Sequence, residues 1–477
     1  MDINSQEHIR LIAPDVAKAY QLGKEQRYNE AYNVLVHHFE SKEIPSYFEE
    51  PCGWTIYRYL KNKESKLSSL EIRKALSYYL DFASRKSSTL HSCMMMQAAN
   101  LEKKHENDFR FIEFCLMWDL NSFREEDYKS SILKTEGGKD LEYQSLAEDV
   151  ATRLYREMKT RHSEDFATQL MPFFEKVKDL CPYNRFIHMY IAQLLYWQGK
   201  KEESLAAYKA ILRNSPEWYI WRNLGDIIDN QDLRVSFYCK ALTMMGKEEF
   251  IGDMRLKLAT LLLDRNKEQA AYEIEKYMNT YKANGWNIVG DVYLLQGKLQ
   301  GVTPSIQSRA FYRNNIEAAE NYAYSDIPEE ELILAEIFKN HEGKERAKLT
   351  NKKKYLEIRT SLTPLLRQSS IGEVLMVRLT KKNGKLVPLT IHKTGKIIEA
   401  IAQKHKSEKR ETPEKNIITG TVSLPPEGDF CFIDHTYYVP AKIRKSYNLQ
   451  EGQKVNAEVR QLPDGRWRVV TIKISQA

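Results

Sequence analysis

Phe430, Phe432 and Tyr438 are the residues of this chain whose type and spacing indicate chemistry, namely stacking on flat ligands. Alternation along an extended strand places Phe430 and Phe432 on one face and Cys431 and Ile433 on the other. The smaller pair fits the core of a small barrel, so the two phenylalanine rings are expected to point away from it. Two outward rings predict a binding partner.

Cations lie close to these rings in the sequence: Lys442, Arg444, Arg466 and Arg468. In single-strand binding, cationic groups neutralise phosphates while each stacked base contributes roughly 1 to 3 kcal/mol. Together the seven residues therefore predict a surface for RNA or single-stranded DNA. Trp467 alternates with its arginine neighbours and faces either the core or the aromatic face, with the core favoured.

Five short strands must position these side chains, and alternation predicts them at 418–423, 429–434, 436–439, 454–461 and 466–474. Turn signals rich in Pro, Gly and Asp separate them, at 425–428, 449–452 and 463–465. Five strands of this length predict a closed barrel of the oligonucleotide/oligosaccharide-binding (OB) type over residues 416–477.

Over about its last sixty residues the chain resembles the cold-shock domain family. The similar stretches are Gly420-Thr421-Val422, Asp429-Phe430-Cys431-Phe432-Ile433, Tyr437-Tyr438-Val439 and 449–455. Three stretches depart from single-domain members: Gly428-Asp429 replaces a Lys-Gly pair, Leu424 a Trp and Pro440 a His. The proline is similar to cold-shock domains attached to exoribonucleases. The resemblance implies RNA binding, and the departures imply weak binding with little sequence preference.

Positive charge is concentrated before this domain. Residues 344–415 carry 19 Lys and Arg against 7 Asp and Glu, whereas residues 1–343 carry 45 against 52. The C-terminal third is therefore expected to meet a polyanion, with a solubilising linker as the alternative. Residues before the linker match the terminal barrel in order: 355–358 with 437–440, Gly372 with Gly452, Asn383-Gly384 with Asp464-Gly465, and Thr390-Ile391 with Thr471-Ile472. These matches predict a second, degenerate OB-like barrel over 329–394. A basic linker follows over 395–415, with a short helix at Lys396–Lys404.

Residues 1–325 are predicted to be helical, with one helix at Leu141–His162, and a repeat is visible in them. Pro182 and Pro216 are 34 residues apart, the period of a tetratricopeptide unit. The residues that carry this resemblance are Ala192, Leu195, Gly199, Tyr208, Ile211, Trp221-x-x-Leu224-Gly225, Ala259, Ala271, Trp286-x-x-Val289-Gly290-x-x-Tyr293 and Gly297. The motifs at Trp221 and Trp286 follow that family's consensus start of the first helix of a unit, and the chain resembles the family most closely over 182–300. The resemblance implies stacked helical hairpins, an α-solenoid, that bind a protein partner in a groove.

Several classes of function find no support in the sequence. His37, His38 and His188 lack a metal-binding partner at a recognisable spacing, and the six cysteines are too far apart for a zinc knuckle or a disulfide framework. No phosphate-binding loop, nucleophile motif or carboxylate pair stands in a recognisable context. We expect no catalysis, cofactor, metal, small-molecule substrate or membrane span, and a cytoplasmic location.

Two interpretations remain open. In the first, the protein is a non-catalytic adaptor whose C-terminal barrels bind RNA or single-stranded DNA while the helical array binds a protein. In the second, it is a protein–protein scaffold, of the kind found in bacterial stress or defence systems, whose barrels pack against the solenoid or a partner. Exposure of Phe430 and Phe432 discriminates between the two.

Overall fold

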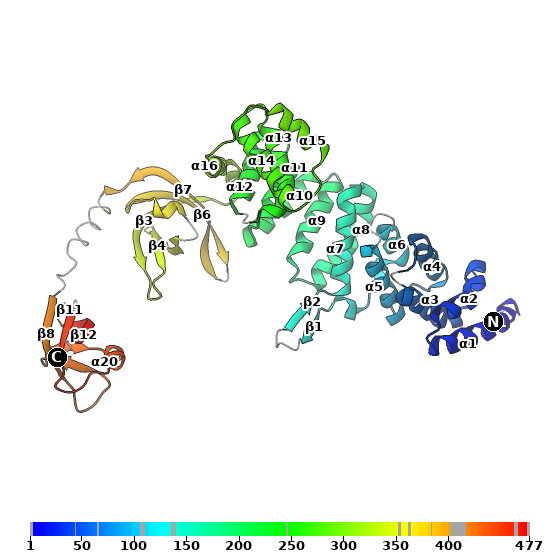
Figure 1. Cartoon of the computed structure of the whole chain (residues 1–477), viewed down its shortest axis with the longest axis horizontal. Coiled ribbons are helices and arrows are strands. Elements are labelled where there is room, and N and C mark those ends of the chain that lie inside the picture. The colour runs from blue at the N-terminus through cyan, green and yellow to red at the C-terminus, as the bar shows by residue number, and fades with distance from the viewer. Residues whose placement is uncertain are drawn as a thin grey trace. The chain divides into compact units, whose positions relative to one another are not determined.

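The computed structural model describes residues 3–42, 44–63, 66–104, 110–134, 140–244, 247–351, 354–360, 364–382, 384–399, 401, 416–461 and 466–474. The chain divides into two compact units, Met1–Asp326 and Ile327–Ala477. The first is helical and the second is built mainly from strands, as the labels in Figure 1 show. The predicted combination of a helical region followed by β-structure is confirmed. Over the described ranges, no helix combines the length and apolarity needed to cross a bilayer.

In the helical unit most helices pack against the next one along the chain, whereas α16 and α17 both pack against α12. Its α-helices are α1 (Ile3–Lys24), α2 (Tyr28–Ser41), α3 (Glu49–Lys63), α4 (Ser69–Phe82), α5 (Thr89–Lys104), α6 (Phe111–Trp118), α7 (Leu146–Arg161), α8 (Glu164–Leu180), α9 (Arg185–Trp197), α10 (Lys201–Asn214), α11 (Trp218–Ile227), α12 (Gln231–Met244), α13 (Gly252–Leu262), α14 (Lys267–Ala283), α15 (Gly290–Lys298), α16 (Ser308–Asn314) and α17 (Glu317–Ala323). Short 3-10 helices lie at Ser46–Phe48, Leu120–Ser122, Glu125–Tyr128 and Glu248–Phe250.

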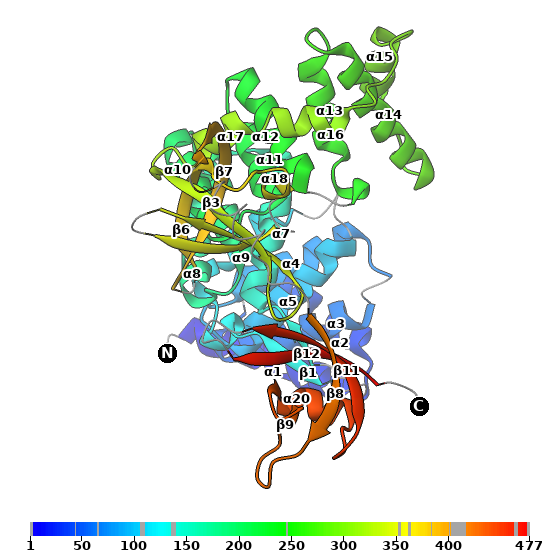
Figure 2. The same ribbon diagram turned by 90° about the vertical axis from the view of Figure 1, so that its left-hand side faces the viewer.

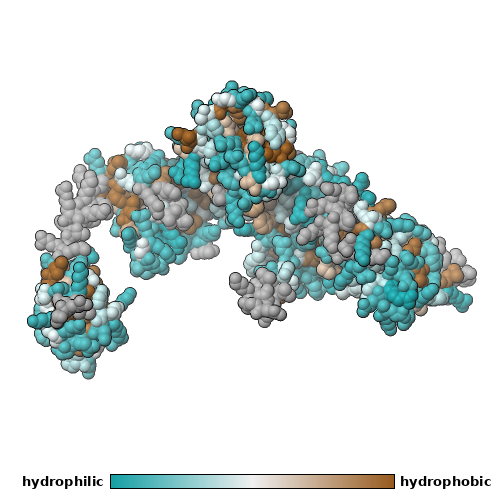
Figure 3. Space-filling model, viewed as in Figure 1, coloured by the Kyte–Doolittle hydropathy of each residue, from teal (hydrophilic) through white to brown (hydrophobic). Residues whose placement is uncertain are grey.

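Small residues let successive helices approach closely, as the repeat pattern predicts. A Cβ added at Gly225 of α11 would lie 2.8 Å from the Tyr238 ring of α12, so this crossing requires glycine. Ala259 of α13 and Ala271 of α14 are both buried where those helices meet. On the face seen in Figure 3, hydrophilic residues predominate over this unit and hydrophobic ones form separate small patches.

Two predictions within the helical unit are wrong. A hairpin of β1 (Ser131–Lys134) and β2 (Asp140–Tyr143) precedes α7, where a helix was predicted from Leu141. Helix α7 begins only at Leu146, because the Ser145 side chain and Glu148 form a capping box there. Trp286 was predicted to start a helix, but it lies before α15 and is 43% exposed.

The first β-structure of the second unit is an antiparallel sheet, ordered β5-β4-β3-β6-β7. Its strands are β3 (Glu329–Lys339), β4 (Glu345–Thr350), β5 (Tyr355–Arg359), β6 (Glu373–Lys382) and β7 (Lys385–Ile397), with the short helix α18 (Pro364–Arg367) between β5 and β6. We predicted a barrel here. Over the described residues β5 and β7 are not joined by a ladder, so the sheet stays open at those two strands.

The second β-structure is a closed five-stranded barrel, as predicted. It comprises β8 (Asn416–Ser423), β9 (Cys431–Ile433), β10 (Tyr437–Val439), β11 (Lys454–Gln461) and β12 (Trp467–Ile474), in the order β10-β12-β11-β8-β9. Among the barrel strands that the structure describes, β10 and β12 pair in parallel and the other pairs are antiparallel. An unpredicted helix, α20 (Ala441–Tyr447), connects β10 to β11 and is visible beside the strands in Figure 2.

The sheet and the barrel repeat one pairing plan. Gly372 before β6 and Gly452 before β11 both have positive φ and donate a backbone N–H to Leu334 and Val422 of the respective first strand. Val377 then pairs with Ile391, and Ala457 with Ile472. The ladder shifts register after Arg378 in the sheet and after Glu458 in the barrel. The predicted matches of Gly372 with Gly452 and of Thr390-Ile391 with Thr471-Ile472 agree with these registers.

Two predicted details of this region are corrected. Tyr355 was matched with Tyr437, but the registers make Leu356 the counterpart of Tyr437, because Leu349 pairs with Leu356 as Ile433 pairs with Tyr437. The helix predicted at Lys396–Lys404 is also wrong at its start, since Lys396 still belongs to β7. Residues 402–415 of the predicted basic linker lie outside the described residues.

Candidate nucleic-acid interface

The rings of Phe430, Phe432 and Tyr438 form one aromatic cluster on the outside of the barrel. Ring centroids are 5.6 Å apart for Phe430–Phe432, 5.6 Å for Phe430–Tyr438 and 6.0 Å for Phe432–Tyr438. Phe432 points outward on β9 because its neighbours Cys431 and Ile433, both fully buried, fill the core. The two phenylalanines are half-buried and Tyr438 is 37% exposed. The predicted alternation is therefore present.

A straight row of paired residues crosses the barrel surface through this cluster. Phe432 pairs with Tyr438 across β9 and β10, Tyr438 pairs with Arg468 across β10 and β12, and Arg468 pairs with Arg460 across β12 and β11. Directly paired residues share a face of a sheet. Two aromatic rings and two guanidinium groups thus lie side by side. We call this set the aromatic–arginine row.

Arg460 is the member of the row that the sequence analysis missed. Both Arg460 and Arg468 are exposed, and within the described residues neither makes an ion pair. Like charges directly opposite each other across a ladder destabilise it. An anion bound between these two guanidinium groups would relieve that repulsion.

The other predicted cations take different positions. Lys442 is exposed on α20, and Arg466 is exposed immediately before β12. Arg444 is half-buried, and its Nη1 donates to the carbonyl oxygens of Gly428 at 3.0 Å and of Phe430 at 3.1 Å. Its guanidinium therefore positions the loop that carries Phe430, and binding phosphate is not its visible role. Trp467 packs against the barrel core, as favoured.

The loop before β9 is shaped to hold the Phe430 ring. Gly428 has a φ of +110°, and a Cβ there would lie 2.6 Å from the Phe430 ring, so both conformation and space require glycine. Asp429 forms an ion pair with Lys445 of α20 at 2.5 Å, and this contact lowers the pKa of the Asp429 carboxyl. The acidic residue that departs from the cold-shock pattern is thus neutralised within the barrel.

The open sheet carries a different set of residues at the positions equivalent to this row. The shared registers align Phe432 with Lys348 and Tyr438 with Glu357, which pair across β4 and β5. Arg468 aligns with Val387 and Arg460 with Thr380, which pair across β7 and β6. These four positions carry no aromatic ring and a net charge of zero. The sheet therefore supplies an internal comparison for the barrel.

The helical unit contains a separate hollow of about 570 Å³, lined by side chains of α7, α9, α11, α12 and α13. Tyr155 and Trp197 form part of an aromatic wall, with ring centroids 5.7 Å apart. Lys159, Arg222 and Lys257 all line the hollow, and desolvation together with the charges of Arg222 and Lys257 lowers the pKa of Lys159. We call this hollow the cationic groove.

The charges of the groove are only partly balanced. Lys257 contacts Asp226 and Asp253, each at 3.0 Å, and Arg222 contacts Asp253 at 3.0 Å. Lys159 has no ion pair within the described residues. The groove therefore retains excess positive charge inside a region whose sequence is acidic.

Comparisons with known proteins add one partial match. A family model described as a domain of unknown function (DUF7017) matches residues 185–319, from the start of α9 into α17. No curated protein gives a significant match. A solved structure titled "Computational Design of Self-Assembling Cyclic Protein Homooligomers" is 11% identical over 67% of this chain and 95% of its own, with a TM-score of 0.09, which carries no argument. The matched range includes α9, α11, α12 and α13, which line the cationic groove. It includes neither α7 nor the barrel that carries the aromatic–arginine row.

Proposed function

We propose that the protein is a non-catalytic adaptor that binds RNA or single-stranded DNA through its C-terminal barrel and a protein segment through its helical array. The observation that carries the proposal is the aromatic–arginine row. Stacking rings beside cations are the two components of sequence-tolerant single-strand binding. The row supplies both on adjacent strands.

The topology of the barrel supports the same conclusion. A closed order in which the third and fifth strands pair in parallel, with a helix between the third and fourth, is similar to an OB fold, and we propose that the barrel is one, of the cold-shock kind. OB folds bind oligonucleotides on the face of strands two and three and with the loop between strands one and two. In this chain those elements are β9, β10 and the loop that carries Phe430.

The proposed mode of binding is stacking of bases on Phe432 and Tyr438 with phosphates near Arg468 and Arg460. Every base has a π-face, so stacking discriminates weakly between sequences. The open sheet, with Lys348 and Glu357 at the equivalent positions, does not offer a second stacking face. We therefore propose one stacking site per chain.

We predict that the two arginines account for part of the salt dependence. Binding of a labelled single-stranded oligonucleotide to the full-length protein should weaken as salt rises. In the double variant Arg460→Gln/Arg468→Gln, the slope of log K against log salt should become shallower by about 1.4, because each phosphate contact with a single strand contributes about 0.7. Fluorescence anisotropy at several salt concentrations measures the slope.

A charge-matched control separates local contacts from net charge. Lys200 and Lys298 are exposed on the helical unit, so Lys200→Gln/Lys298→Gln changes the net charge equally and should leave the slope unchanged. If both double variants change the slope alike, the row does not bind phosphate. If the intact protein fails to bind at low salt, the nucleic-acid part of the proposal is wrong and the scaffold interpretation is favoured.

The helical unit is proposed to be a tetratricopeptide-like array whose cationic groove binds an acidic peptide segment. The hairpins α9/α10, α11/α12 and α13/α14 follow each other as the 34-residue pattern predicts, and a solenoid of such hairpins offers a concave surface. The excess positive charge around Lys159 favours a negatively charged segment, and the aromatic wall supplies apolar contact.

We predict that reversing one charge in this groove weakens the binding of acidic peptides. On a peptide array probed with the full-length protein, acidic peptides should bind in preference to neutral and basic ones. Lys159→Glu should reduce that signal about tenfold or more, because like charges across an interface repel strongly. Lys200→Glu makes the same charge change outside the groove lining and should have no effect. Equal losses in the two variants would contradict an acidic segment in the groove.

A further inference from the structure

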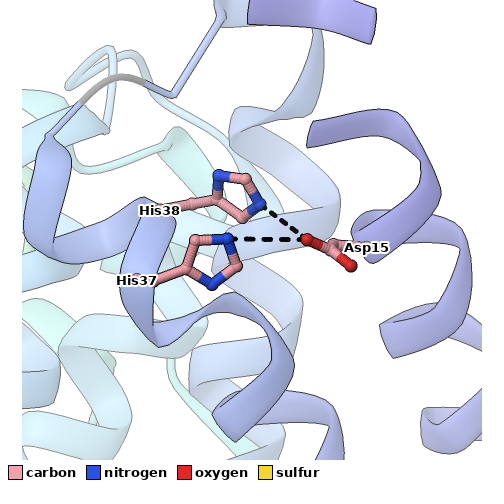
Figure 4. Close-up of side chains that lie close together, drawn as sticks. All are labelled: Asp15, His37 and His38. Carbon is pink, nitrogen blue, oxygen red and sulfur yellow. Dashed lines mark hydrogen bonds and ion pairs between the residues drawn. The ribbon is translucent and has the colours of Figure 1, made fainter. Parts of the chain in front are cut away.

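Three potential metal ligands meet between the first two helices. Asp15 lies on α1, and His37 and His38 lie on α2. Figure 4 shows both imidazole rings directed at the same carboxylate, and the Nε2 atoms of His38 and His37 lie 2.9 Å and 3.5 Å from Asp15 Oδ2. All three donor atoms lie within 4.8 Å of one another. The sequence analysis found no such partner because Asp15 is 22 residues before His37.

The separations suit a common ion. Zinc binds histidine nitrogen and carboxylate oxygen at about 2.0 to 2.2 Å, which in a tetrahedral site places neighbouring donors roughly 3.3 to 3.5 Å apart. The His37–Asp15 distance of 3.5 Å lies at the upper end of that range, and the His38–Asp15 distance of 2.9 Å lies below it. The three donor atoms all lie within 4.8 Å of one another, so rotation of the imidazole rings toward a central ion would bring them into its coordination shell.

The donor set also selects the class of ion. Two imidazoles and one carboxylate suit late first-row divalent ions such as zinc, whereas calcium and magnesium prefer oxygen ligands throughout. The side chain of His38 is 13% exposed and that of Asp15 35%, while His37 is 63% exposed and leaves a route from solvent. With three protein ligands, a water molecule would complete the coordination.

We propose that Asp15, His37 and His38 form a zinc site that joins α1 to α2. The ion crosslinks the first helical pair of the array, where α1 packs on α2 and α3. This inference is independent of nucleic-acid binding by the barrel and of peptide binding in the groove. It assigns a site to residues that those proposals leave unused.

The test is zinc binding to the full-length protein after dialysis against a chelator. Isothermal titration with zinc alone should show one equivalent bound, and the melting temperature should rise with zinc. His38→Ala and Asp15→Asn should each weaken binding at least tenfold. Cobalt(II) should give visible absorption bands in the wild type and lose them in the same variants, which reports coordination directly.

A matched variant guards against unspecific binding. His188 is an exposed histidine on α9, so His188→Ala should bind zinc like the wild type. Circular dichroism before titration shows whether a variant is folded, and His37→Gln provides a second, milder removal of a ligand. Absence of a zinc-dependent melting shift in the wild type, or an equal loss in His188→Ala, would overturn the site. The three residues would then be a hydrogen-bonded pair with a neighbouring histidine.

Discussion

Replacing Phe432 and Tyr438 together by alanine should lower the affinity of the full-length protein for a single-stranded oligonucleotide by about 30-fold or more. Each stacked base contributes roughly 1 to 3 kcal/mol, and 1.4 kcal/mol corresponds to a factor of ten. Neither ring belongs to the core or to the residues packed against it, so the barrel should remain folded. Anisotropy of labelled oligo-U and oligo-dT at low salt measures the loss.

The open sheet provides the control for this experiment. Lys348→Ala/Glu357→Ala alters the two positions that the shared strand registers align with Phe432 and Tyr438. It should leave affinity unchanged if the stacking face is unique to the barrel. Unchanged affinity in the Phe432/Tyr438 variant would contradict the stacking mechanism, even if the protein still bound through its charges.

Phe430 requires a separate variant because its role depends on a loop. Arg444 and Gly428 hold that loop, so Phe430→Ala removes a ring whose position is already determined before any ligand arrives. A preorganised ring loses little conformational entropy on binding. Phe430→Ala, added to the Phe432/Tyr438 double variant, should therefore lower the affinity for the oligonucleotide further.

The composition of the row explains which site residues were predictable. That Phe432 points outward follows from its own neighbours, since alternation is a local property of a strand. That Arg460 joins the row depends on the register between β11 and β12, and nothing in the local sequence around Arg460 gives that register. Arg444 was assigned to phosphate because α20 was not predicted, and the helix is what brings its guanidinium to the Phe430 loop.

The match between the open sheet and the barrel could likewise be predicted only in part from the sequence. Turn glycines Gly372 and Gly452 could be matched from the sequence because a positive φ restricts the residue type. Within the third strand, the match relied on identical tyrosines, Tyr355 and Tyr437, and was wrong by one residue. A slip of one residue moves every side chain to the opposite face. It would have aligned the outward Tyr438 with Leu356, which is buried.

In the helical unit, the repeat pattern was informative where small residues mediate packing. Gly225, Ala259 and Ala271 could be identified because helices approach closely only over small side chains. Trp286 fitted the same pattern by residue type, but α15 begins four residues later and leaves the ring beside Tyr281. Neither the proposed zinc site nor the buried ion pair of Arg255 and Glu273 has a local signature, because the partners come from different helices.

Arg255 of α13 is the centre of a buried polar network between helices. Its guanidinium binds Glu273 of α14, donates to Tyr312 of α16 at 3.1 Å, and pairs with Glu248 at 2.8 Å. Glu273 is fully buried, and it also accepts hydrogen bonds from Gln269, at 2.7 Å, and from Tyr312. The network lies inside the range matched by the family model.

Arg255→Met should therefore destabilise the helical unit by about 3 to 5 kcal/mol. The substitution keeps most of the volume but leaves the Glu273 carboxylate buried without its positive partner, and an uncompensated buried charge is costly to this extent. Urea unfolding of the full-length protein, followed by far-UV circular dichroism, should show a lower midpoint. The helical signal makes this measurement specific to the helical unit.

Two further variants decide whether the cost arises from the unpaired charge. In Arg255→Met/Glu273→Leu both charges are gone, and most of the stability should return, because a buried ion pair replaced by apolar residues is often neutral or stabilising. Arg265→Met breaks an exposed pair with Asp232, and exposed pairs contribute at most about 1 kcal/mol. If the double variant is no more stable than Arg255→Met, the loss comes from packing or from the bonds to Glu248 and Tyr312. The Glu273 carboxylate would then tolerate burial without Arg255.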